Sequence, residues 1–418
     1  MTPSERLAAL NQVLKHCRAA PFYRDRIPEE PLTSLSGLKR IPLTTKEDLR
    51  RVSPKGLICV SPGELYQYHE TFGTTGNPVS TWLTKEDLLD NAWEINACGI
   101  NFTEDDIVLV RFPYAISAVA HMVHTAAQLK QACVIPASSR STISPFPRII
   151  NLLRKLEVTV LAGLPQQAVL IAEAAELMGL EPASDFPKLR AILTAGEPLT
   201  NGRRRLLESI WNVPIFDVYG MAEIGTAVVD CEFGRPHPLE EYFIFELLGE
   251  DLQSEVKPGE LGYLVVTTLR KRATPMIRYL TEDRAKITCQ ECACGREVLL
   301  GVHGRKQDTI STGDRVLDMW DLEEIVSHLP CRRFWVVGPA SAGLRFILEE
   351  EKPNDSVDTG LIRKLEEMYQ LRLDVEIVPK GTLYDRIELL AIGEVGKTRY
   401  IYSAEEIKQK AYLKSPRI

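Results

Sequence analysis

Short apolar runs alternate with longer amphipathic stretches along the first three quarters of the chain. Residues 146–157 and 165–179 place their apolar side chains at helical spacing. Other runs have the length and composition of buried strands: 105–112, 132–136, 158–163, 189–196 and 213–220. Because strands that alternate with helices favour parallel pairing, we predict an α/β fold with a sheet that is at least partly parallel.

The pattern changes towards the C-terminus. Residues 259–269 alternate between apolar and polar positions, which predicts a strand with one exposed face. Beyond Arg305 the pattern predicts helices at 321–329 and 359–369 and strands at 333–338, 344–350 and 373–379. We therefore expect a large N-terminal domain at residues 1–304, with mixed sheets flanked by helices, and a small α+β C-terminal domain at residues 305–418.

Composition narrows the class of protein. The chain has 418 residues, with 50 Lys and Arg against 57 Asp and Glu, and its net charge of -7 argues against a nucleic-acid partner. No apolar run approaches the roughly 20 residues that cross a bilayer, so we expect no membrane partner. The first residues are charged and amphipathic, unlike a signal peptide. An odd number of scattered cysteines, 9 in all, favours a reducing compartment, and we expect a cytoplasmic protein.

The string at 71–78 is rich in glycine and threonine. Gly73, Thr74, Thr75 and Gly76 follow an aromatic run, and such a loop brings backbone N–H groups and hydroxyls close to a polyphosphate. It is not a Walker loop, because no Gly-Lys-Ser/Thr follows. Taken alone, the string fits a hairpin turn equally well.

Further motifs follow in a fixed order and decide between these interpretations. They are Thr194-Ala-Gly-Glu-Pro198, Tyr219-Gly-Met-Ala-Glu-Ile-Gly225, Arg278-Tyr-Leu-Thr-Glu-Asp283, Gly304-Arg305 and Gly396-Lys397. The first two end predicted strands, where ligands gather in open α/β sheets. Tyrosine stacks on bases, carboxylates hold Mg²⁺ or ribose hydroxyls, and Arg or Lys neutralises phosphate. Each residue alone also fits a structural role, but the ordered set favours a nucleotide site.

This ordered set resembles the adenylate-forming superfamily of acyl- and aryl-CoA synthetases, peptide-synthetase adenylation domains and luciferases, and most of all its phenylacetate-CoA ligase-like branch. The resemblance covers essentially the whole chain. It implies that Glu223 binds Mg²⁺, that Thr74 contacts the phosphates, and that Lys397, on a mobile small domain, bridges the attacking carboxylate and the α-phosphate. It further implies a nucleotide-binding set of Gly73, Thr74, Thr75, Gly76, Ala195, Gly196, Glu197, Pro198, Tyr219, Gly220, Met221, Ala222, Asp283 and Arg305.

The implied reaction is ATP-dependent activation of a small aryl or short acyl carboxylic acid to an acyl-AMP, followed by transfer to a thiol, for which CoA is expected. Attack on the α-phosphorus needs positive charge and alignment rather than a base, because the acid is already ionised at neutral pH. Mg²⁺, Lys397, Glu223 and Thr74 would supply these. ATP, Mg²⁺ and CoA are therefore the expected cofactors and co-substrates, and a homodimer is left open.

Departures from the family pattern leave alternatives open. Phe72 and Asn77 stand in the phosphate loop where the family has a small hydroxyl residue and lysine, and Gln307 replaces an acid near Arg305. One alternative is a stand-alone adenylation enzyme that loads a carrier-protein thiol or an amine. Another is a non-catalytic nucleotide-binding protein, which the combined presence of Glu223 and Lys397 with the ribose residues disfavours.

For the carboxylic acid, the resemblance implies a pocket beside the stretch that begins at residue 111. Phe112, Tyr114, Ala115 and Tyr219 are the expected lining, and we interpret His121 and His124 as ordinary helix residues.

The cysteine spacing indicates a metal site. Cys231, His237, Cys292 and Cys294 form two close pairs, which suits tetrahedral Zn²⁺, and Cys289 is held in reserve. The resembled branch includes members with a structural zinc at this place. Four protein ligands leave no position open for catalysis, so the Zn²⁺ would be structural. The alternative is a set of reduced cysteines in a turn. The remaining cysteines, at 17, 59, 98, 133 and 331, are expected in the core.

Overall fold

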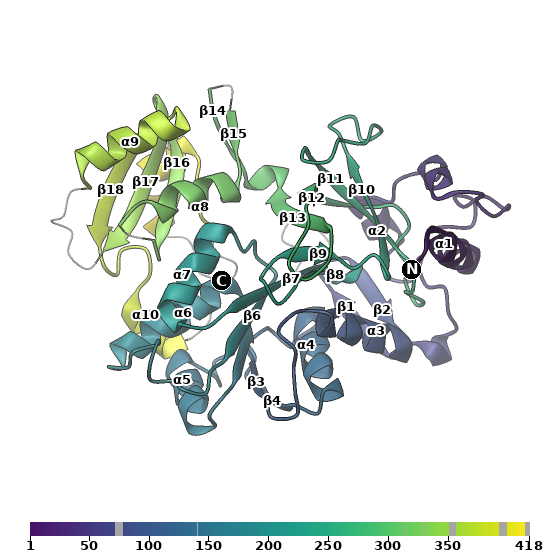
Figure 1. Cartoon of the computed structure of the whole chain (residues 1–418), viewed down its shortest axis with the longest axis horizontal. Helices are drawn as coiled ribbons and strands as arrows, with labels where there is room; N and C mark the ends of the chain where they lie inside the picture. The colour runs from purple at the N-terminus through teal and green to yellow at the C-terminus, as the bar shows by residue number, and fades with distance from the viewer. Residues whose placement is uncertain are drawn as a thin grey trace.

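The computed structural model describes residues 1–71, 78–139, 141–313, 315–330, 332–350, 357–392 and 399–413. Figure 1 shows a large body and, at one end, a smaller lobe drawn in yellow-green. The predicted architecture of a large N-terminal and a smaller C-terminal domain is confirmed. The helices are α1 Pro3–Cys17, α2 Lys46–Val52, α3 Lys85–Asn96, α4 Ala118–Leu129, α5 Phe146–Lys155, α6 Pro165–Leu177, α7 Asn201–Trp211, α8 Met319–Ser327, α9 Thr359–Tyr369, α10 Arg386–Ile392 and α11 Ala404–Lys408.

The central sheet has the strand order β4-β3-β5-β6-β7-β8-β9. Pairing is parallel from β4 to β7 and antiparallel from β7 to β9. Its strands are β3 Ile107–Val110, β4 Cys133–Pro136, β5 Val160–Gly163, β6 Ala191–Ala195, β7 Ile215–Met221, β8 Gly225–Asp230 and β9 Pro236–Pro238. All five predicted strands are therefore present in one sheet that is partly parallel, as expected.

One expectation about this sheet is wrong. β4 is an edge strand with half-exposed and exposed residues, and Cys133 is exposed rather than part of the core. An apolar run does not reveal whether its strand is central or at an edge. Cys17, Cys59 and Cys98 are buried, as expected, and Cys331 lies outside the described residues.

A second sheet is antiparallel throughout, in the order β10-β11-β12-β13. Its strands are β10 Phe243–Leu248, β11 Leu261–Thr268, β12 Tyr279–Cys289 and β13 Val298–Arg305. A separate hairpin, β1 Gln67–Glu70 with β2 Ser80–Leu83, flanks residues 72–77. The short 3₁₀ turns are η1 Leu35–Arg40, η2 Pro62–Glu64, η3 Lys306–Asp308 and η4 Ala411–Leu413.

The small lobe contains the order β16-β17-β18, with β17 and β18 parallel, beside the hairpin β14-β15. The strands are β14 Ile310–Thr312, β15 Arg315–Leu317, β16 Trp335–Ala340, β17 Gly343–Glu350 and β18 Arg372–Pro379. Both helices and all three strands predicted beyond Arg305 are found. The boundary at residues 304 and 305 stays a prediction.

Apolar packing joins the two domains. The core beneath α5, α6 and α7 also contains Phe334, Val336 and Ile347 from the small lobe. α10 packs against α5 and α6, as Figure 1 shows. The small lobe also contacts α7 directly, because α8 packs against it and Gly202, near the start of α7, lies against Glu323 of α8. Within the described parts of the chain, no helix combines the length and apolar character needed to cross a bilayer.

Candidate active site and metal centre

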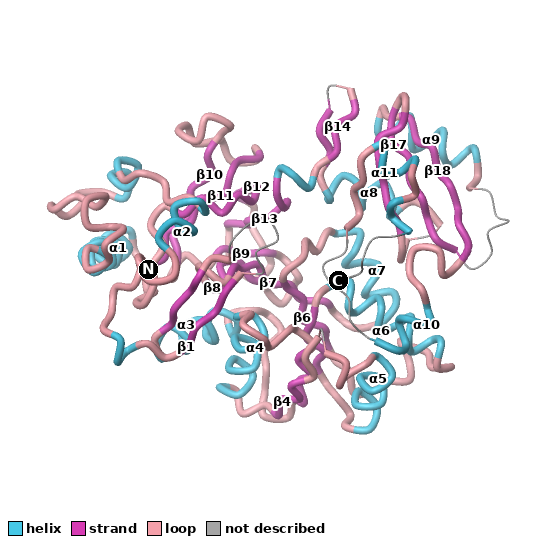
Figure 2. Tube along the Cα trace, turned by 180° about the vertical axis from the view of Figure 1, so that it is seen from behind, coloured by secondary structure: helices cyan, strands magenta, loops and turns pink. Residues whose placement is uncertain are grey.

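The motifs at 194–198 and 219–225 meet at one edge of the central sheet. β6 and β7 are neighbours in the sheet (Figure 2) and pair in parallel, with Ala195 opposite Val218, so both motifs emerge at carboxyl ends of adjacent strands. Gly196 has a backbone φ of +81°, which residues other than glycine rarely adopt. It turns the chain away from the end of β6. Glu197 follows, and its Oε2 accepts a hydrogen bond from the backbone N of Gln166 at 3.4 Å.

The second sheet contributes the ribose candidates to the same edge. The Tyr219 hydroxyl donates to Asp283 Oδ2 at 2.7 Å, and Arg305 Nε lies 3.7 Å from Asp283 Oδ1. Burial and the neighbouring Asp283 carboxylate raise the pKa of Tyr219 well above its ordinary value. Pro198 is close as well, because a Cβ on Gly304 would lie 3.7 Å from its Cγ. Residues from β6, β7, β12 and β13 are thus brought together.

Glu223 lies in the turn between β7 and β8 and is 1% exposed. Its Oε1 accepts a hydrogen bond from the Tyr279 hydroxyl at 3.0 Å, whereas its Oε2 is buried without a partner among the described residues. A buried carboxylate oxygen without a partner is costly unless a ligand uses it. Glu223 therefore fits a hard cation such as Mg²⁺, which prefers oxygen ligands. Gly220, Met221 and Ala222, also expected at the nucleotide, are half-buried beside it.

Lys271 is a buried cation beside this carboxylate that the sequence analysis missed. It is 6% exposed, and its Nζ donates to the backbone carbonyl of Glu223 at 3.0 Å. Burial lowers its pKa, while Asp87 and Glu94 oppose that shift. Burial in turn raises the pKa of Glu94 to about 8. Lys271 lies in the string Arg-Lys-Arg, which has the composition of a solvated surface loop, and no local pattern marks it as buried.

Arg278 does not face the nucleotide motifs, although it begins the string that ends at Asp283. Its guanidinium pairs with both carboxylate oxygens of Glu246, at 3.0 and 2.9 Å, and both side chains are buried. It also donates to the carbonyls of Lys39 and Ile41. Arg278 therefore ties the second sheet to the N-terminal segment.

Several predicted site residues lie outside the described part of the chain. They are Gly73, Thr74, Thr75, Gly76 and Lys397, together with Phe72, Asn77 and the side chain of Gln307. Their roles stay predictions.

The stretch that begins at residue 111, expected beside the carboxylic acid, has some residues buried in the core and others exposed to solvent. Phe112 is fully buried, Tyr114 is half-buried and Ala115 is exposed. His121 and His124 lie in α4, as expected for helix residues. Both also contact Tyr114, since His121 Nε2 lies 2.9 Å from its carbonyl and His124 Nδ1 lies 3.0 Å from its hydroxyl.

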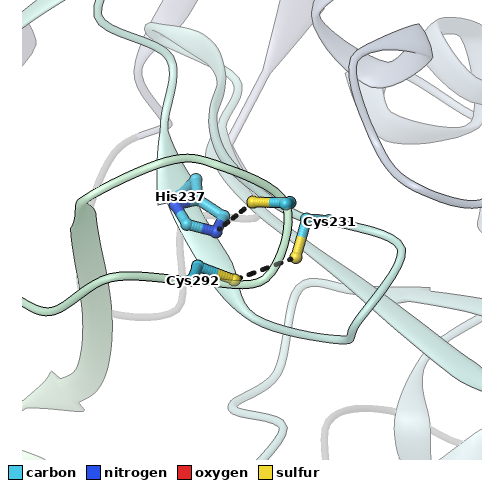
Figure 3. Close-up of side chains that lie close together, drawn as sticks. Cys231, His237 and Cys292 are labelled. Carbon is cyan, nitrogen blue, oxygen red and sulfur yellow. Dashed lines mark hydrogen bonds between the residues drawn. The ribbon is translucent and has the colours of Figure 1, made fainter.

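The four predicted zinc ligands converge, and Figure 3 labels three of them, Cys231, His237 and Cys292. The ligand atoms of Cys231, His237, Cys292 and Cys294 all lie within 4.8 Å of one another. The Sγ atoms of Cys231 and Cys292 are 3.8 Å apart, and Cys294 Sγ lies 3.3 Å from His237 Nε2. In a tetrahedral site with Zn–S distances of about 2.3 Å, two sulfur ligands lie about 3.8 Å apart. The separation of Cys231 and Cys292 therefore matches that of two thiolate ligands of one Zn²⁺.

The surroundings of the cluster orient its histidine. His237 Nδ1 donates to the carbonyl of Val298 at 2.7 Å, which leaves Nε2 as the electron-pair donor towards the sulfurs. Burial raises the pKa of Cys231 to about 11, so a bound metal would have to displace its proton. Cys289 is exposed and lies outside the group.

Comparison with known families gives the class of the protein. Residues 24–268, more than half of the chain, match the family model described as AMP-binding enzyme. The chain belongs to this family. The predicted adenylate-forming class is therefore confirmed.

Individual relatives place the chain in the phenylacetate-CoA ligase-like branch, as predicted. Phenylacetate-coenzyme A ligase of Thermus thermophilus is 30% identical over 327 residues, 74% of this chain and 72% of that enzyme. The Pseudomonas putida enzyme of the same name is 32% identical over 298 residues, 67% of this chain and 65% of that enzyme. The alignment thus spans slightly less than two thirds of the Pseudomonas protein.

Solved structures support the fold. A 2-hydroxyisobutyryl-CoA ligase in its postadenylation state, in complex with 2-HIB-AMP, matches with a TM-score of 0.84 at 20% identity, over 99% of this chain and 92% of that chain. ATP-bound MatB from Rhodopseudomonas palustris matches with a TM-score of 0.57 at 14% identity, over 86% of this chain and 70% of that chain. Both comparisons confirm the predicted fold class.

Proposed function

We propose that the chain uses ATP to convert a small carboxylic acid into an acyl-AMP and pyrophosphate, and then transfers the acyl group to the thiol of CoA. One observation carries the proposal. Glu223, in the turn after β7, has a buried carboxylate oxygen without a donor among the described residues, and it lies close enough to the Tyr219–Asp283 pair to affect the pKa of Tyr219. This is a polar site for a magnesium nucleotide in a chain of the AMP-binding family.

Each residue of the site has a proposed role that follows from its chemistry. Asp283 and Arg305 would hold the ribose hydroxyls, and Tyr219, whose hydroxyl is fixed by Asp283, would present its ring to the adenine. Glu223 would hold Mg²⁺, which neutralises phosphate charge during attack. Lys271 fixes the backbone at Glu223 through its hydrogen bond to the carbonyl and adds a buried positive charge nearby.

Lys397 has a proposed role in the first half-reaction. A positively charged side chain between carboxylate and α-phosphate would offset the repulsion of two anions as they approach. Thr74 and Thr75, with the adjacent glycines, would hold the terminal phosphates by hydroxyl and N–H contacts. Because Lys397 belongs to the small domain, the position of that domain would decide whether acyl-AMP formation proceeds.

CoA is the acceptor we propose, because the relatives named above are coenzyme A ligases. A carrier-protein thiol or an amine is the alternative acceptor. The cytoplasmic location and the homodimer also stay predictions.

We also propose that the cluster of Cys231, His237, Cys292 and Cys294 holds one structural Zn²⁺. The sulfur separation and the oriented histidine support this. The metal would join the segment that follows Glu223 to the loop between β12 and β13.

The direct test is pyrophosphate release from ATP and Mg²⁺ in the presence of a library of alkyl and aryl acids. The acyl-AMP formed is then offered to CoA, to a carrier protein with its phosphopantetheine thiol, or to hydroxylamine. Pyrophosphate release followed by acyl transfer to CoA supports the proposal. Pyrophosphate release with transfer only to the carrier protein or the amine would favour the alternative acceptor. If no acid in the library leads to pyrophosphate release, the proposed acid-activating function is refuted.

A further inference from the structure

Strand β1 carries a buried histidine whose second ring nitrogen has no partner among the described residues. His69 is 2% exposed, and its Nδ1 lies 2.9 Å from the carbonyl of Ile116. A carbonyl only accepts, so Nδ1 carries the proton. Burial lowers the pKa of His69 to about 4, so the ring is neutral at pH 7. Nε2 is then a hydrogen-bond acceptor, and it is buried without a donor from the described chain.

Gln67, two residues earlier on the same strand, presents a second acceptor of this kind. His121 Nε2 faces the carbonyl of Tyr114 at 2.9 Å, so Nε2 donates there and Nδ1 is the ring nitrogen that accepts. The atom of Gln67 that lies 3.2 Å from His121 Nδ1 must therefore be the amide nitrogen. This leaves Gln67 Oε1 as a buried acceptor, again without a donor among the described residues.

The two acceptors share one location. Side chains at positions i and i+2 of a strand lie on the same face of its sheet, and both residues here contact His121, whose ring is 5.3 Å from that of His69. The Tyr114 ring is also 5.3 Å from that of His121. β1 leads directly to residues 72–77, and Lys271, which holds Glu223, is close enough to affect the ionisation of His69. The acceptors therefore lie beside His121 and Tyr114, at the proposed acid pocket, and His69 is within electrostatic reach of Lys271.

We propose that the carboxylic acid activated by this enzyme carries a hydroxyl or amino group that donates a hydrogen bond to His69 Nε2 or Gln67 Oε1, and that an amino group can donate to both. Buried polar groups in folded proteins almost always have partners, and neither of these two has a donor among the described residues. A site built to bind a substrate hydroxyl strongly rejects the analogue that lacks it, because its own polar groups then stay unpaired. The inference rests on the proposed function and specifies its substrate class.

The test compares matched acids in the pyrophosphate-release assay. Phenylacetate, its ring-hydroxylated and amino-substituted forms, and its methoxy form differ little in shape, as do propionate and lactate. We expect kcat/KM to be at least about tenfold higher for the preferred donor-bearing acid than for its unsubstituted partner. The methoxy acid, which accepts but does not donate, should gain nothing over phenylacetate.

His69→Asn is the decisive variant, because its amide nitrogen can take the place of Nδ1 at the Ile116 carbonyl while the acceptor at Nε2 is removed. We expect the preference for the donor-bearing acid to fall about tenfold or more. His328→Asn, which removes an exposed histidine on the small domain, should leave the preference unchanged. If His69→Asn does not fold, Gln67→Met makes the same test on the second acceptor.

Equal kcat/KM for donor-bearing and unsubstituted acids would overturn the inference, as would a preference that survives in the variants. Either result would mean that a group other than the substrate, such as bound water, supplies the donors. Pyrophosphate release with none of the acids would instead overturn the proposed function, and this inference with it.

Discussion

Arg203 on α7 of the large domain and Glu323 on α8 of the small domain form an ion pair that is almost completely buried. Arg203 Nε and a terminal nitrogen lie 2.8 and 2.6 Å from Glu323 Oε1, and the two side chains are 3% and 6% exposed. The same guanidinium donates to the Tyr400 hydroxyl at 3.0 Å, and that hydroxyl donates to Gln166 Oε1 at 3.0 Å. This contact holds Tyr400, three residues after Lys397 in the sequence, against the start of α6.

Glu323→Ala should slow acyl-AMP formation more than acyl transfer. The substitution leaves Arg203 buried without its partner, at a cost of roughly 3–5 kcal/mol for the docked arrangement. A small domain that docks less often presents Lys397 less often. Pyrophosphate release measures the first step, and thioester formation from supplied acyl-AMP measures the second.

The double variant Arg203→Leu with Glu323→Leu is the matched control. Replacing both charges by apolar groups removes the unpaired cation and should recover most of the first half-reaction. Equal losses in both half-reactions would show that the pair supports folding and has no specific role in docking.

Lys397→Ala should abolish acyl-AMP formation and leave acyl transfer from supplied acyl-AMP largely intact. Loss of one charge contact in the transition state should cost roughly 3 kcal/mol, about a hundredfold in rate. Lys408→Ala, which removes an exposed lysine of α11, serves as the control. If both half-reactions fall together, Lys397 does not have the proposed role.

The sequence predicts the elements better than it predicts what is buried next to the site. The five apolar runs are correctly identified as strands because a strand flanked by helices is apolar along most of its length. The edge position of Cys133 was missed because position in a sheet depends on distant pairing. Lys271 and His69 were missed for the same reason, since the local sequence around each does not indicate burial and both side chains contact residues far away in the chain. Residues in spaced metal or nucleotide motifs were easier to find.

Glu223→Gln should reduce activity most strongly when Mg²⁺ is limiting. The amide keeps the size of the side chain and an acceptor for the Tyr279 hydroxyl, but it loses the negative charge that attracts the metal. Raising Mg²⁺ should restore part of the rate. Kinetics are measured over a Mg²⁺ titration, with Glu86→Gln on the exposed face of α3 as control. An unchanged Mg²⁺ dependence would make Glu223 a structural acid.

His69 should make the protein less stable as the pH falls from about 6.5 to about 4. Its folded-state pKa is lowered from 6.5 to about 4, so the unfolded chain binds the proton more tightly across this window. The loss of unfolding free energy at the acid end is at most roughly 3 kcal/mol, at about 1.4 kcal/mol for each pKa unit. Urea unfolding at several pH values measures it. His69→Asn should flatten the slope, and an identical slope in the variant would contradict the assignment.

The purified protein should contain about one Zn²⁺ per chain, and Cys294→Ser should lower metal content and melting temperature together. Cys231 and His237 follow the Glu223 turn, while Cys292 and Cys294 lie between β12 and β13, so the proposed metal would join two sheets that both reach the proposed site. Structural zinc contributes on the order of 10 kcal/mol in small peptides, and a preformed domain should gain less.

Cys289→Ser is the matched control for the zinc site, because Cys289 belongs to the same cysteine-rich string but is exposed and outside the ligand group. It should keep both the metal and the melting temperature. Folded Cys294→Ser enzyme should keep its KM for ATP, because four protein ligands close the coordination shell and leave no position for substrate. If elemental analysis finds no zinc in protein purified in the absence of chelator, the predicted zinc site is refuted. If Cys294→Ser instead loses activity but keeps its melting temperature and its metal content, the cluster takes part in the reaction.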